Sequence, residues 1–419
     1  MAEAPLTAMG SKTTATTTAQ AGYLQLNIIA DRIEFGLLQN LDLVNDWGIS
    51  VGPSGPFWIA NNDGDLATLL SGDTRGTPLV ASSQMVSIPD GSPSGQVFNG
   101  TGDFVIGTGA DSAPATRIFA SENGALDAWN AQLSPTSQAL SVVKTPGAVY
   151  KGLTIGVNAG ANFLYAADFH DDRIYVFDKN FQPVTLAAGA FTDPNIPAGF
   201  APFGIQALGG KLYVTYAQQN SLQHDDVAGP GDGFVDVFDT AGKLLDRLIV
   251  GSPGNSSSPL NSPWGVTMAP PAFGDFGGDL LVGNFGDGKI NAFDPNTGAF
   301  LGSLSDPSGN AIVLPGLWSL TFGNGNGAGD VNTLYFTSAP TQELDGLFGS
   351  LQSALNTPLA GVGSTFSVKE GESFNFTDTE GGNTIDGSIA TINDVATGAR
   401  PADFTALIDW GDGHTSAGT

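Results

Sequence analysis

The sequence predicts an all-β protein whose main body is a six-bladed β-propeller closed by an N-terminal strand. Three observations lead to this fold class. The 419 residues include 58 Gly and 25 Pro, and short apolar runs alternate with turn residues, as in proteins built from many short strands. No long segment keeps a helical apolar period, so few helices are expected. A group of strands also recurs along the chain, which is typical of repeat architectures.

The repeating unit is clearest in residues 262–304, where Gly, Pro, Asp and Asn separate four apolar runs. The second and third strands of this unit recur in segments 57–70, 117–130, 164–178, 212–239, 280–294 and 334–351. Their spacing suits propeller blades with loop insertions between them. The first strand recurs ahead of each pair, at 46–52, 96–102, 150–156, 202–208, 263–269 and 317–323.

Small residues in the first strands indicate a position next to the propeller axis. Gly48, Gly152, Gly204 and Gly265 occupy similar places in their repeats. Glycine lacks the Cβ that would clash where backbones approach closely. The first strand of each repeat is therefore expected to be the innermost strand of its blade.

The outer strands predict how the ring closes. A fourth strand follows five of the repeats, for example at 77–88 and 244–251, but none follows the sixth. Residues 23–31 are an apolar run with no repeat of their own. We expect this run to supply the outer strand of the sixth blade, because closure removes an exposed sheet edge. The predicted propeller spans residues 22–351.

Three further segments are predicted outside the propeller. Residues 1–21 are small and polar and are expected to be flexible, and residues 352–365 have the composition of a linker. Residues 366–419 contain alternating runs that predict a partial β-sandwich-like segment. The sequence DWGDGHTS within it resembles a hairpin of bacterial surface Ig-like or PKD-like modules. The chain stops shortly after this hairpin, so we expect the module to be truncated.

Composition restricts the possible partners. The net charge is −27, from 41 acidic and 14 basic residues, so phosphate backbones and anionic lipids are expected to be repelled. No apolar stretch is long enough to span a bilayer, and the N-terminus lacks the apolar run of a signal peptide. With no cysteine, neither disulfides nor thiolate chemistry is available. We expect a monomer with no nucleic-acid partner and no membrane span.

Acidic residues at the turns between third and fourth strands have a local explanation. Asp178, Asp239 and Asp294 each begin a turn that continues with Gly, Pro or Asn. Aspartate in this position accepts hydrogen bonds from the backbone of its own turn. We therefore interpret these carboxylates as turn caps rather than catalytic groups.

The propeller segment resembles an uncharacterised bacterial family of predicted secreted six-bladed propellers, related in shape to NHL-type propellers. The segments that carry the resemblance are NDWGIS (45–50), PFWIANNDG (56–64), LYAADFHDDRIYVFD (164–178), PAGFAPFGIQALGGKLYVTYA (197–217), HDDVAGPGDGFVDVFD (224–239) and LLVGNFGDGKINAFDP (280–295). The resemblance implies the propeller fold and an extracellular or cell-surface location. It implies no activity.

Polar residues at the ends of the second strands are candidates for a metal site on the axis. Asn61, Glu122, Asp168 and Asn284 come from four different repeats, and their oxygens suit calcium or another divalent cation. The arrangement resembles lactonase-type propellers, in which a central ion polarises an ester carbonyl. His170 is then the candidate base. The alternative, which we favour, is that these residues satisfy the turns at which they stand.

Two further groups of residues have a functional and a structural interpretation. The tripeptide HDD occurs at His170–Asp172 and at His224, Asp225 and Asp226, either as a shared cation site or as two solvated loops. Trp47, Trp264 and Trp318 occupy equivalent places in their repeats. They form either an aromatic platform for a sugar or, as we favour, packing between blades.

Three functional hypotheses follow from the sequence. The first, which we favour, is a binding propeller in a secreted or surface multidomain protein, with a protein or saccharide ligand. The second is a metal-dependent hydrolase of the lactonase or esterase type. The third is a structural module with bound calcium.

Overall fold

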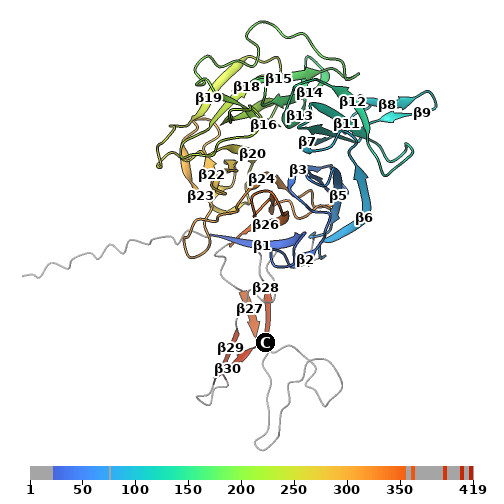
Figure 1. Ribbon diagram of the computed structural model, residues 1–419. Helices are drawn as coiled ribbons and strands as arrows, with labels where there is room; N and C mark the ends of the chain where they lie inside the picture. Colours follow the sequence, from blue (N-terminus) through green and yellow to red (C-terminus); the bar gives the residue numbers. More distant parts are fainter. Residues whose placement is uncertain are drawn as a thin grey trace, which may run out of the picture.

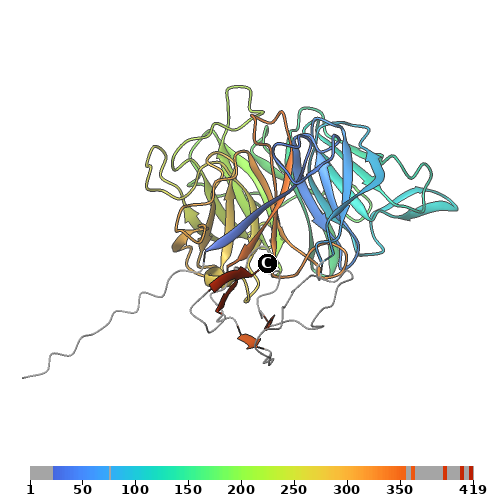
Figure 2. The same ribbon diagram turned by 90° about the horizontal axis from the view of Figure 1, so that it is seen from below.

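The computed structural model describes residues 22–74 and 77–354, together with four short strands nearer the C-terminus. Six β-sheets are arranged as blades around an axis (Figures 1 and 2). The single helix among these residues is a short 3-10 turn, η1 (Gly274–Phe276). The all-β six-bladed propeller predicted from the sequence is therefore confirmed.

The blades follow one another along the chain. Blade one contains β3 (Asp46–Val51), β4 (Phe57–Asn61), β5 (Leu66–Ser71) and β6 (Val80–Ser87). Blade two contains β7 (Pro93–Phe98), β10 (Arg117–Ser121), β11 (Ala125–Trp129) and β12 (Leu140–Lys144). A hairpin of β8 (Val105–Thr108) and β9 (Asp111–Pro114) is inserted after β7 and projects from the rim (Figure 1).

The remaining blades complete the ring. Blade three contains β13 (Tyr150–Asn158), β14 (Ala161–Asp168) and β15 (Arg173–Phe177). Blade four contains β16 (Phe200–Leu208), β17 (Lys211–Gln218), β18 (Phe234–Phe238) and β19 (Leu244–Val250). Blade five contains β20 (Pro263–Met268), β21 (Leu280–Asn284), β22 (Ile290–Phe293) and β23 (Phe300–Ser303). Blade six contains β24 (Leu317–Phe322), β25 (Leu334–Ser338) and β26 (Leu347–Ser353).

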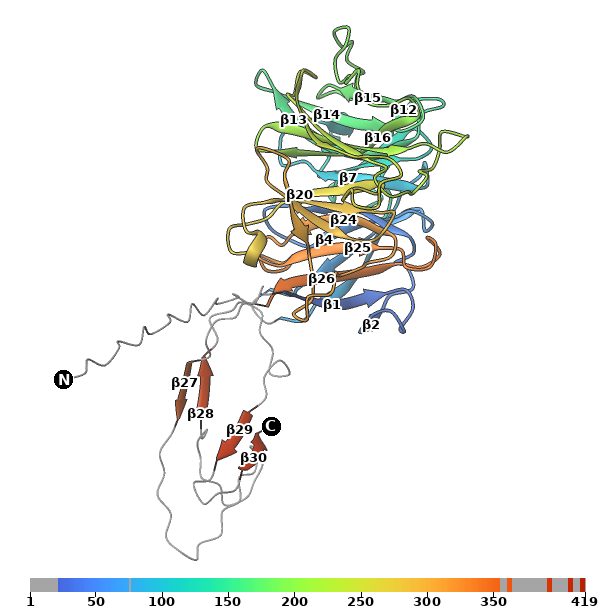
Figure 3. The ribbon, with the colours of Figure 1, turned by 90° about the vertical axis from the view of Figure 1, so that its left-hand side faces the viewer.

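The N-terminal strand closes the ring as the sequence predicts. Strand β1 (Tyr23–Ala30) pairs antiparallel with β26, from Tyr23 opposite Ser353 to Ala30 opposite Leu347. Figure 3 shows the two strands side by side at one edge of the disc. The short strand β2 (Leu38–Gln39) adds to the outside of β1 in parallel. The first and last parts of the propeller are thus joined in one sheet, which leaves β26 without an open edge.

Blade three differs from the prediction of a fourth strand after each of the first five repeats. Beyond β15, pairing is limited to a bridge between Phe177 and Pro183 with two hydrogen bonds, from Asp178 N to Gln182 O at 2.9 Å and from Val184 N to Val176 O at 2.8 Å. Proline has no backbone N–H to donate to a ladder. The residues up to Phe200 therefore form a loop that covers the outside of this blade instead of a strand.

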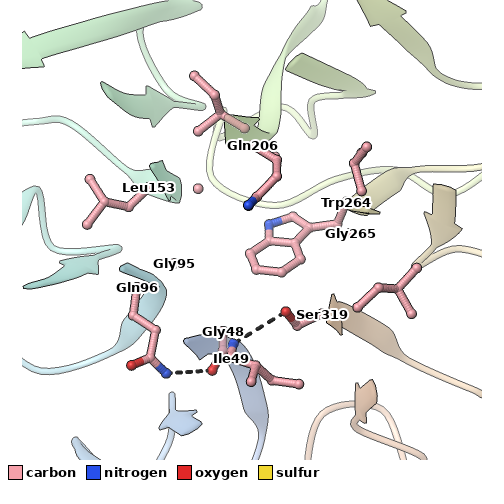
Figure 4. A pocket seen from close by; sticks show the side chains of 14 residues that line it. Gly48, Ile49, Gly95, Gln96, Leu153, Gln206, Trp264, Gly265 and Ser319 are labelled. Carbon is pink, nitrogen blue, oxygen red and sulfur yellow. Dashed lines mark hydrogen bonds between the residues drawn. The ribbon is translucent and has the colours of Figure 1, made fainter. Parts of the chain in front are cut away.

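Glycines let the inner strands pack directly against one another around the axis. A Cβ on Gly204 would lie 2.2 Å from the carbonyl oxygen of Trp264 in the next blade. Gly48, Gly95, Gly152 and Gly265 meet the backbone of the following blade in the same way. In blade six the equivalent residue is Ser319, whose hydroxyl accepts a hydrogen bond from Ile49 N at 3.3 Å. These residues line an axial cavity of about 40 Å³ (Figure 4).

Buried apolar side chains fill the wedges between blades. Trp58 of blade one, for example, packs on Trp129 of blade two with ring centroids 4.7 Å apart. Each neighbouring pair of blades shares such a cluster, and a separate cluster lies at the axis. The core is therefore distributed around the ring, and each blade contributes to two wedges.

The C-terminal strands are described only by their backbone pairing. Strand β27 (Ala360–Gly363) pairs with β28 (Ala390–Asn393), and β29 (Ala406–Asp409) pairs with β30 (Thr415–Gly418). The last pair coincides with the hairpin predicted around residues 404–416. The predicted flexible segment 1–21 and most of the predicted segment 366–419 lie outside the described residues.

Candidate functional site

Six aromatic side chains close the axis at the end where the second strands finish. We call this group the axial plug; it consists of Trp47, Phe169, Phe203, Trp264, Phe285 and Trp318. Trp47 stacks on Trp318 with ring centroids 3.7 Å apart, and Trp264 meets Trp318 edge-on at 5.6 Å. The exposed fraction is 2% for Trp47, 1% for Trp318 and 8% for Trp264. Their rings face one another rather than solvent, which agrees with a packing role better than with a platform for a sugar. The three rings pack across the axis, however, and not between neighbouring blades as the sequence suggested.

A lysine takes the place of an aromatic residue in this ring. Trp47, Trp264 and Trp318 directly precede the axial Gly or Ser of their inner strands, and Lys151 directly precedes Gly152 in β13. Its side chain is only 2% exposed, and its Nζ lies 4.9 Å from the centroid of the Trp47 ring. A buried ammonium needs compensation by opposite charge or by aromatic faces, and Lys151 has both.

Carboxylates from distant loops supply the opposite charge. Lys151 forms an ion pair with Glu122, whose side chain is 10% exposed. A second carboxylate, Asp225 Oδ1, lies 3.6 Å from the lysine Nζ. The amide Nδ2 of Asn62 donates to Glu122 Oε2 at 2.8 Å, and His224 Nδ1 lies 2.7 Å from Asp225 Oδ1. Both partners of the lysine are therefore held by a further side chain.

Two more acids complete what we call the mouth cluster: Glu122, Lys151, His224, Asp225, Asp226 and Glu343. Burial raises the pKa of Glu343 to about 7; Lys151 lowers it, while Glu122, Asp226 and Asp225 raise it. Burial likewise raises the pKa of Asp226. Burial also acts upward on Asp225, but the hydrogen bond from His224 and the charge of Lys151 hold its pKa below the usual value. Four carboxylates thus share one lysine, which makes the mouth strongly acidic.

The second HDD loop contributes to the mouth cluster, whereas the first lies beside it. His170 Nδ1 lies 3.0 Å from Asp171 Oδ1, so this histidine is paired with its own neighbour. The two loops touch through Gln219, whose Nε2 donates to the carbonyl oxygens of Phe169 and His170. Among the described residues, the atoms of Glu122, His224 and Asp225 that can bind metal lie within 4.8 Å of one another. Imidazole and carboxylate ligands of this kind suit several divalent cations.

The other members of the predicted axial metal ring are bound within their own blades. Asn61 Nδ2 donates to Leu66 O and to Thr68 Oγ1, at 3.3 and 3.2 Å. The other two behave similarly: Asp168 Oδ1 accepts from the backbone N of Val149 and His170, and Asn284 Nδ2 donates to Pro259 O and Asp287 Oδ1. Only Glu122 of that ring reaches the mouth cluster. One buried oxygen of each residue, Asn61 Oδ1, Asp168 Oδ2 and Asn284 Oδ1, has no hydrogen-bond partner among the described residues. The turns therefore satisfy these side chains only in part, and the axial metal ring stays a prediction from the sequence.

Lys151 and Glu343 were not predicted as site residues. The sequence holds a signal for Lys151, since it is a charged residue at a position that is aromatic in four other repeats. Glu343 has no such signal, because its loop after β25 has no counterpart of the same length in the other blades. Its place beside Glu122 and Asp226 depends entirely on the folded ring.

Together, the fold and the occluded axis define a β-propeller of the binding or scaffold class. The chain is 31% identical over 346 residues to uncharacterized protein R648 of Acanthamoeba polyphaga mimivirus, covering 80% of this chain and 81% of that protein. It is 32% identical to uncharacterized protein L690 of the same virus over 323 residues, covering 74% of this chain and 80% of that protein. The chain belongs to the family of these viral proteins. No protein-family model matches it.

The bacterial family predicted from the sequence, with its bacterial Ig-like or PKD-like module, is therefore wrong, because these relatives are viral. The blade segments that carried the resemblance are strands and turns whose composition is set by the propeller itself. Such segments identify the fold better than the lineage.

Distant solved structures resemble the chain in outline. A streptogramin B lyase structure is 12% identical with a TM-score of 0.44, covering 80% of this chain and 99% of its own. The hydrazine synthase of Kuenenia stuttgartiensis is also 12% identical, with a TM-score of 0.42, covering 73% of this chain and 96% of its own. Likeness at this level says nothing about activity. Within the part of the chain that the structure describes, a search for a helix that could span a membrane finds none.

Proposed function

We propose that this protein is a binding module that receives a cationic group of a partner protein at the mouth cluster, without turnover. One observation supports the proposal above all others. Two carboxylates, Glu122 and Asp225, lie within ion-pair distance of the buried Lys151, and Asp226 and Glu343 from the same mouth interact with them electrostatically. Lys151 balances one of the two paired charges, and the raised pKa values of Glu343 and Asp226 mean that both carboxyl groups lose their protons more readily when a cation arrives.

The whole molecule favours the same kind of partner. A net charge of −27 attracts basic surfaces over a distance and increases their rate of encounter. At the mouth itself, Lys151 lies against Trp47 and beside Glu122. Lys151 itself fills this position, so a lysine or arginine side chain from another protein would meet the more exposed carboxylate Asp225, which is 60% exposed.

The geometry supports a hydrolase less well. Metal-assisted hydrolysis of a lactone or ester needs several ligands around one ion and space for a substrate. Asn61, Asp168 and Asn284 make hydrogen bonds within their own blades, and each leaves only one buried oxygen without a partner among the described residues. The axial plug fills the position where a substrate would enter, and His170 is paired with Asp171.

The proposal is tested by titrating the protein with a lysine-rich peptide at low ionic strength in a calorimeter. We expect binding that weakens at high salt and falls about tenfold in the variant Asp226→Asn/Glu343→Gln, which loses two ionisable carboxyl groups of the mouth but keeps the Lys151–Glu122 pair. The control is Asp111→Asn, an exposed carboxylate on the β8–β9 hairpin. Equal affinity in all three proteins would show that attraction is diffuse and would refute a site at the mouth.

A second candidate function, a divalent-cation site, is favoured by the close approach of Glu122, His224 and Asp225. A cation bound by these three side chains competes with Lys151 for the carboxylates. If it binds, elemental analysis finds one metal per chain, and chelation lowers the melting temperature of the wild type but not of His224→Ala. No metal and no shift on chelation would exclude this candidate and leave the binding of a cationic partner unaffected.

A further inference from the structure

The sequence contains Asn-x-Ser/Thr acceptor motifs for N-glycosylation that the binding site does not use. Two of them lie among the described residues: Asn99–Gly100–Thr101 and Asn255–Ser256–Ser257. A third begins at Asn375, outside the described residues. The two described motifs have the same local conformation but opposite environments, which makes them a matched pair.

Asn255 presents its amide nitrogen to solvent. It lies in the loop between β19 and β20, and Asn255, Ser256 and Ser257 are all exposed. The side-chain oxygen Oδ1 accepts a hydrogen bond from Ser257 N at 3.0 Å, which is an Asx turn. The bond occupies Oδ1 and leaves the nitrogen Nδ2 without a hydrogen-bond partner among the described residues.

Asn99 makes the same turn but its amide nitrogen is occupied. Its Oδ1 accepts from Thr101 N at 3.0 Å. Its Nδ2 donates to the carbonyl oxygens of Asp103 and Ala115, at 3.0 and 2.8 Å, and the residue is only 3% exposed. A sugar on this nitrogen would break both bonds and has no space, because buried polar groups need their partners.

We infer that Asn255 is an N-glycan acceptor and that Asn99 is not. In the reaction, Asn255 Nδ2 forms a bond to the anomeric carbon of a polyprenyl-diphosphate-linked oligosaccharide. The bond from that carbon to the phosphate oxygen breaks, the lipid diphosphate leaves, and the Nδ2 proton passes to a base of the transferase. The reaction takes place only in a chain that passes through a glycosylating compartment, and the experiment below supplies that passage.

The loop that carries Asn255 is anchored beside the insertion that contributes to the mouth cluster. Gly254 N donates to Pro230 O at 2.8 Å, and the neighbouring residues Asn255 and Ser258 bond to the backbone within the loop. A glycan on Asn255 therefore extends from an anchored loop rather than from a strand, and its attachment breaks none of these bonds.

The inference is tested by producing the full chain behind a secretion leader in a eukaryotic host and purifying the folded, soluble protein. Site-resolved mass spectrometry after trimming with an endoglycosidase then reports one residual N-acetylhexosamine on each occupied asparagine. We expect the mass increase on the Asn255 peptide and none on the Asn99 peptide. Asn255→Gln and Ser257→Ala remove the increase, and Thr101→Ala leaves it unchanged.

Two outcomes would overturn the inference. One is an unmodified Asn255 in protein that has passed through the secretory pathway. A glycan on Asn375 or on a co-expressed glycoprotein verifies that the protein was exposed to the transferase. The other is a modified Asn99 in the folded fraction, which would show that burial does not decide between the two motifs. Neither outcome bears on the binding function of the mouth cluster.

Discussion

At the scale of single residues, Lys151 is a buried ammonium whose loss of hydration is offset by a carboxylate and an aromatic ring. Its ammonium is taken out of water, against Trp47, and is paired with the nearly buried Glu122. Removing one partner of such a pair leaves an uncompensated charge in a poorly solvated position, which is far more costly than loss of an exposed pair. The mouth cluster therefore contributes to stability as well as to the proposed binding.

We predict that Lys151→Met lowers the free energy of unfolding by about 3 kcal/mol, because Glu122 then lacks its counter-charge. The double variant Lys151→Met/Glu122→Gln is expected to recover most of this loss, since the carboxylate that was paired with the buried ammonium is removed together with it. Urea denaturation followed by tryptophan fluorescence measures both. The control is Lys289→Met, whose pair with Asp287 is 40% and 30% exposed and is expected to cost less than about 1 kcal/mol. Similar losses in the two single variants would contradict a buried pair.

Residues with local roles were predictable from the sequence, and residues with distant partners were not. Asp178, Asp239 and Asp294 were interpreted as turn caps, and each accepts backbone hydrogen bonds from its own turn, for example from Asn180 N to Asp178 at 2.8 Å. Such bonds depend on a few neighbouring residues. The approach of Glu122 to Lys151 depends on how two blades are placed around the axis, and sequence spacing carries no information about that.

At the scale of elements, the loop that replaces the fourth strand of blade three has a charged contact with blade four. Asp193 in this loop forms an ion pair with Arg247 of β19, and its side chain is fully buried. Asp236 in β18 is also buried. Burial and the charge of Asp193 raise the pKa of Asp236 to about 7, against smaller opposing effects of Arg247 and Tyr216. Blade four therefore carries a carboxyl group that is easier to bury in its protonated form.

This carboxyl predicts a pH dependence of stability. The folded pKa of Asp236 is about 7 and the ordinary value is 3.8, so between these values the folded state holds a proton that the unfolded state releases. Stability from this group is complete below about pH 4 and is lost as the pH rises through 7. Each pH unit in that window costs about 1.4 kcal/mol, so the full loss is on the order of 4 kcal/mol at pH 8.

Asp236→Asn removes the titration. We expect this variant to gain stability relative to the wild type as the pH rises from 5 to 8, measured by thermal unfolding at both ends of the range. Asp111→Asn, on the exposed hairpin, is expected to have the same stability as the wild type at pH 5 and at pH 8. A constant difference between Asp236→Asn and the wild type across this range would show that Asp236 is ionised in the folded protein.

The sequence predicted the inner parts of the blades correctly and missed two features on the outside of the ring. The inner and second strands of all six blades were anticipated, because Gly-rich and apolar segments recur in a fixed order. The β8–β9 hairpin and the missing fourth strand of blade three were not. Both lie on the outside of the ring, where a blade tolerates insertion or loss of structure without disturbing the inner strands, so the repeat pattern does not constrain them.

At the scale of the whole molecule, closure by β1 decides whether six blades behave as one unit. The strand joins Tyr23 to Ser353 and so connects the two ends of the propeller. Contacts within a blade are local, but this sheet holds residues that are more than three hundred positions apart. The sequence allowed closure to be predicted, because the sixth repeat lacked an outer strand and residues 23–31 lacked a repeat. The composition of the mouth was not predictable, since it is created only when the closed ring brings loops of unequal length together.

Closure can be tested with a single engineered disulfide, because the chain contains no cysteine. Leu24 and Gln352 are paired across β1 and β26, and Leu24 is 43% exposed. We expect Leu24→Cys/Gln352→Cys to stabilise the oxidised protein by up to ~5 kcal/mol, since the bond closes a loop of nearly the whole propeller in the unfolded chain. Unfolding with and without reductant measures the gain. The matched control, Thr108→Cys/Asp111→Cys, joins paired residues of the β8–β9 hairpin and closes only a short turn, so its gain is expected to be much smaller. Equal gains from the two bonds would mean that the ends of the propeller already remain together in the unfolded state, and that β1 contributes little to holding the ring closed.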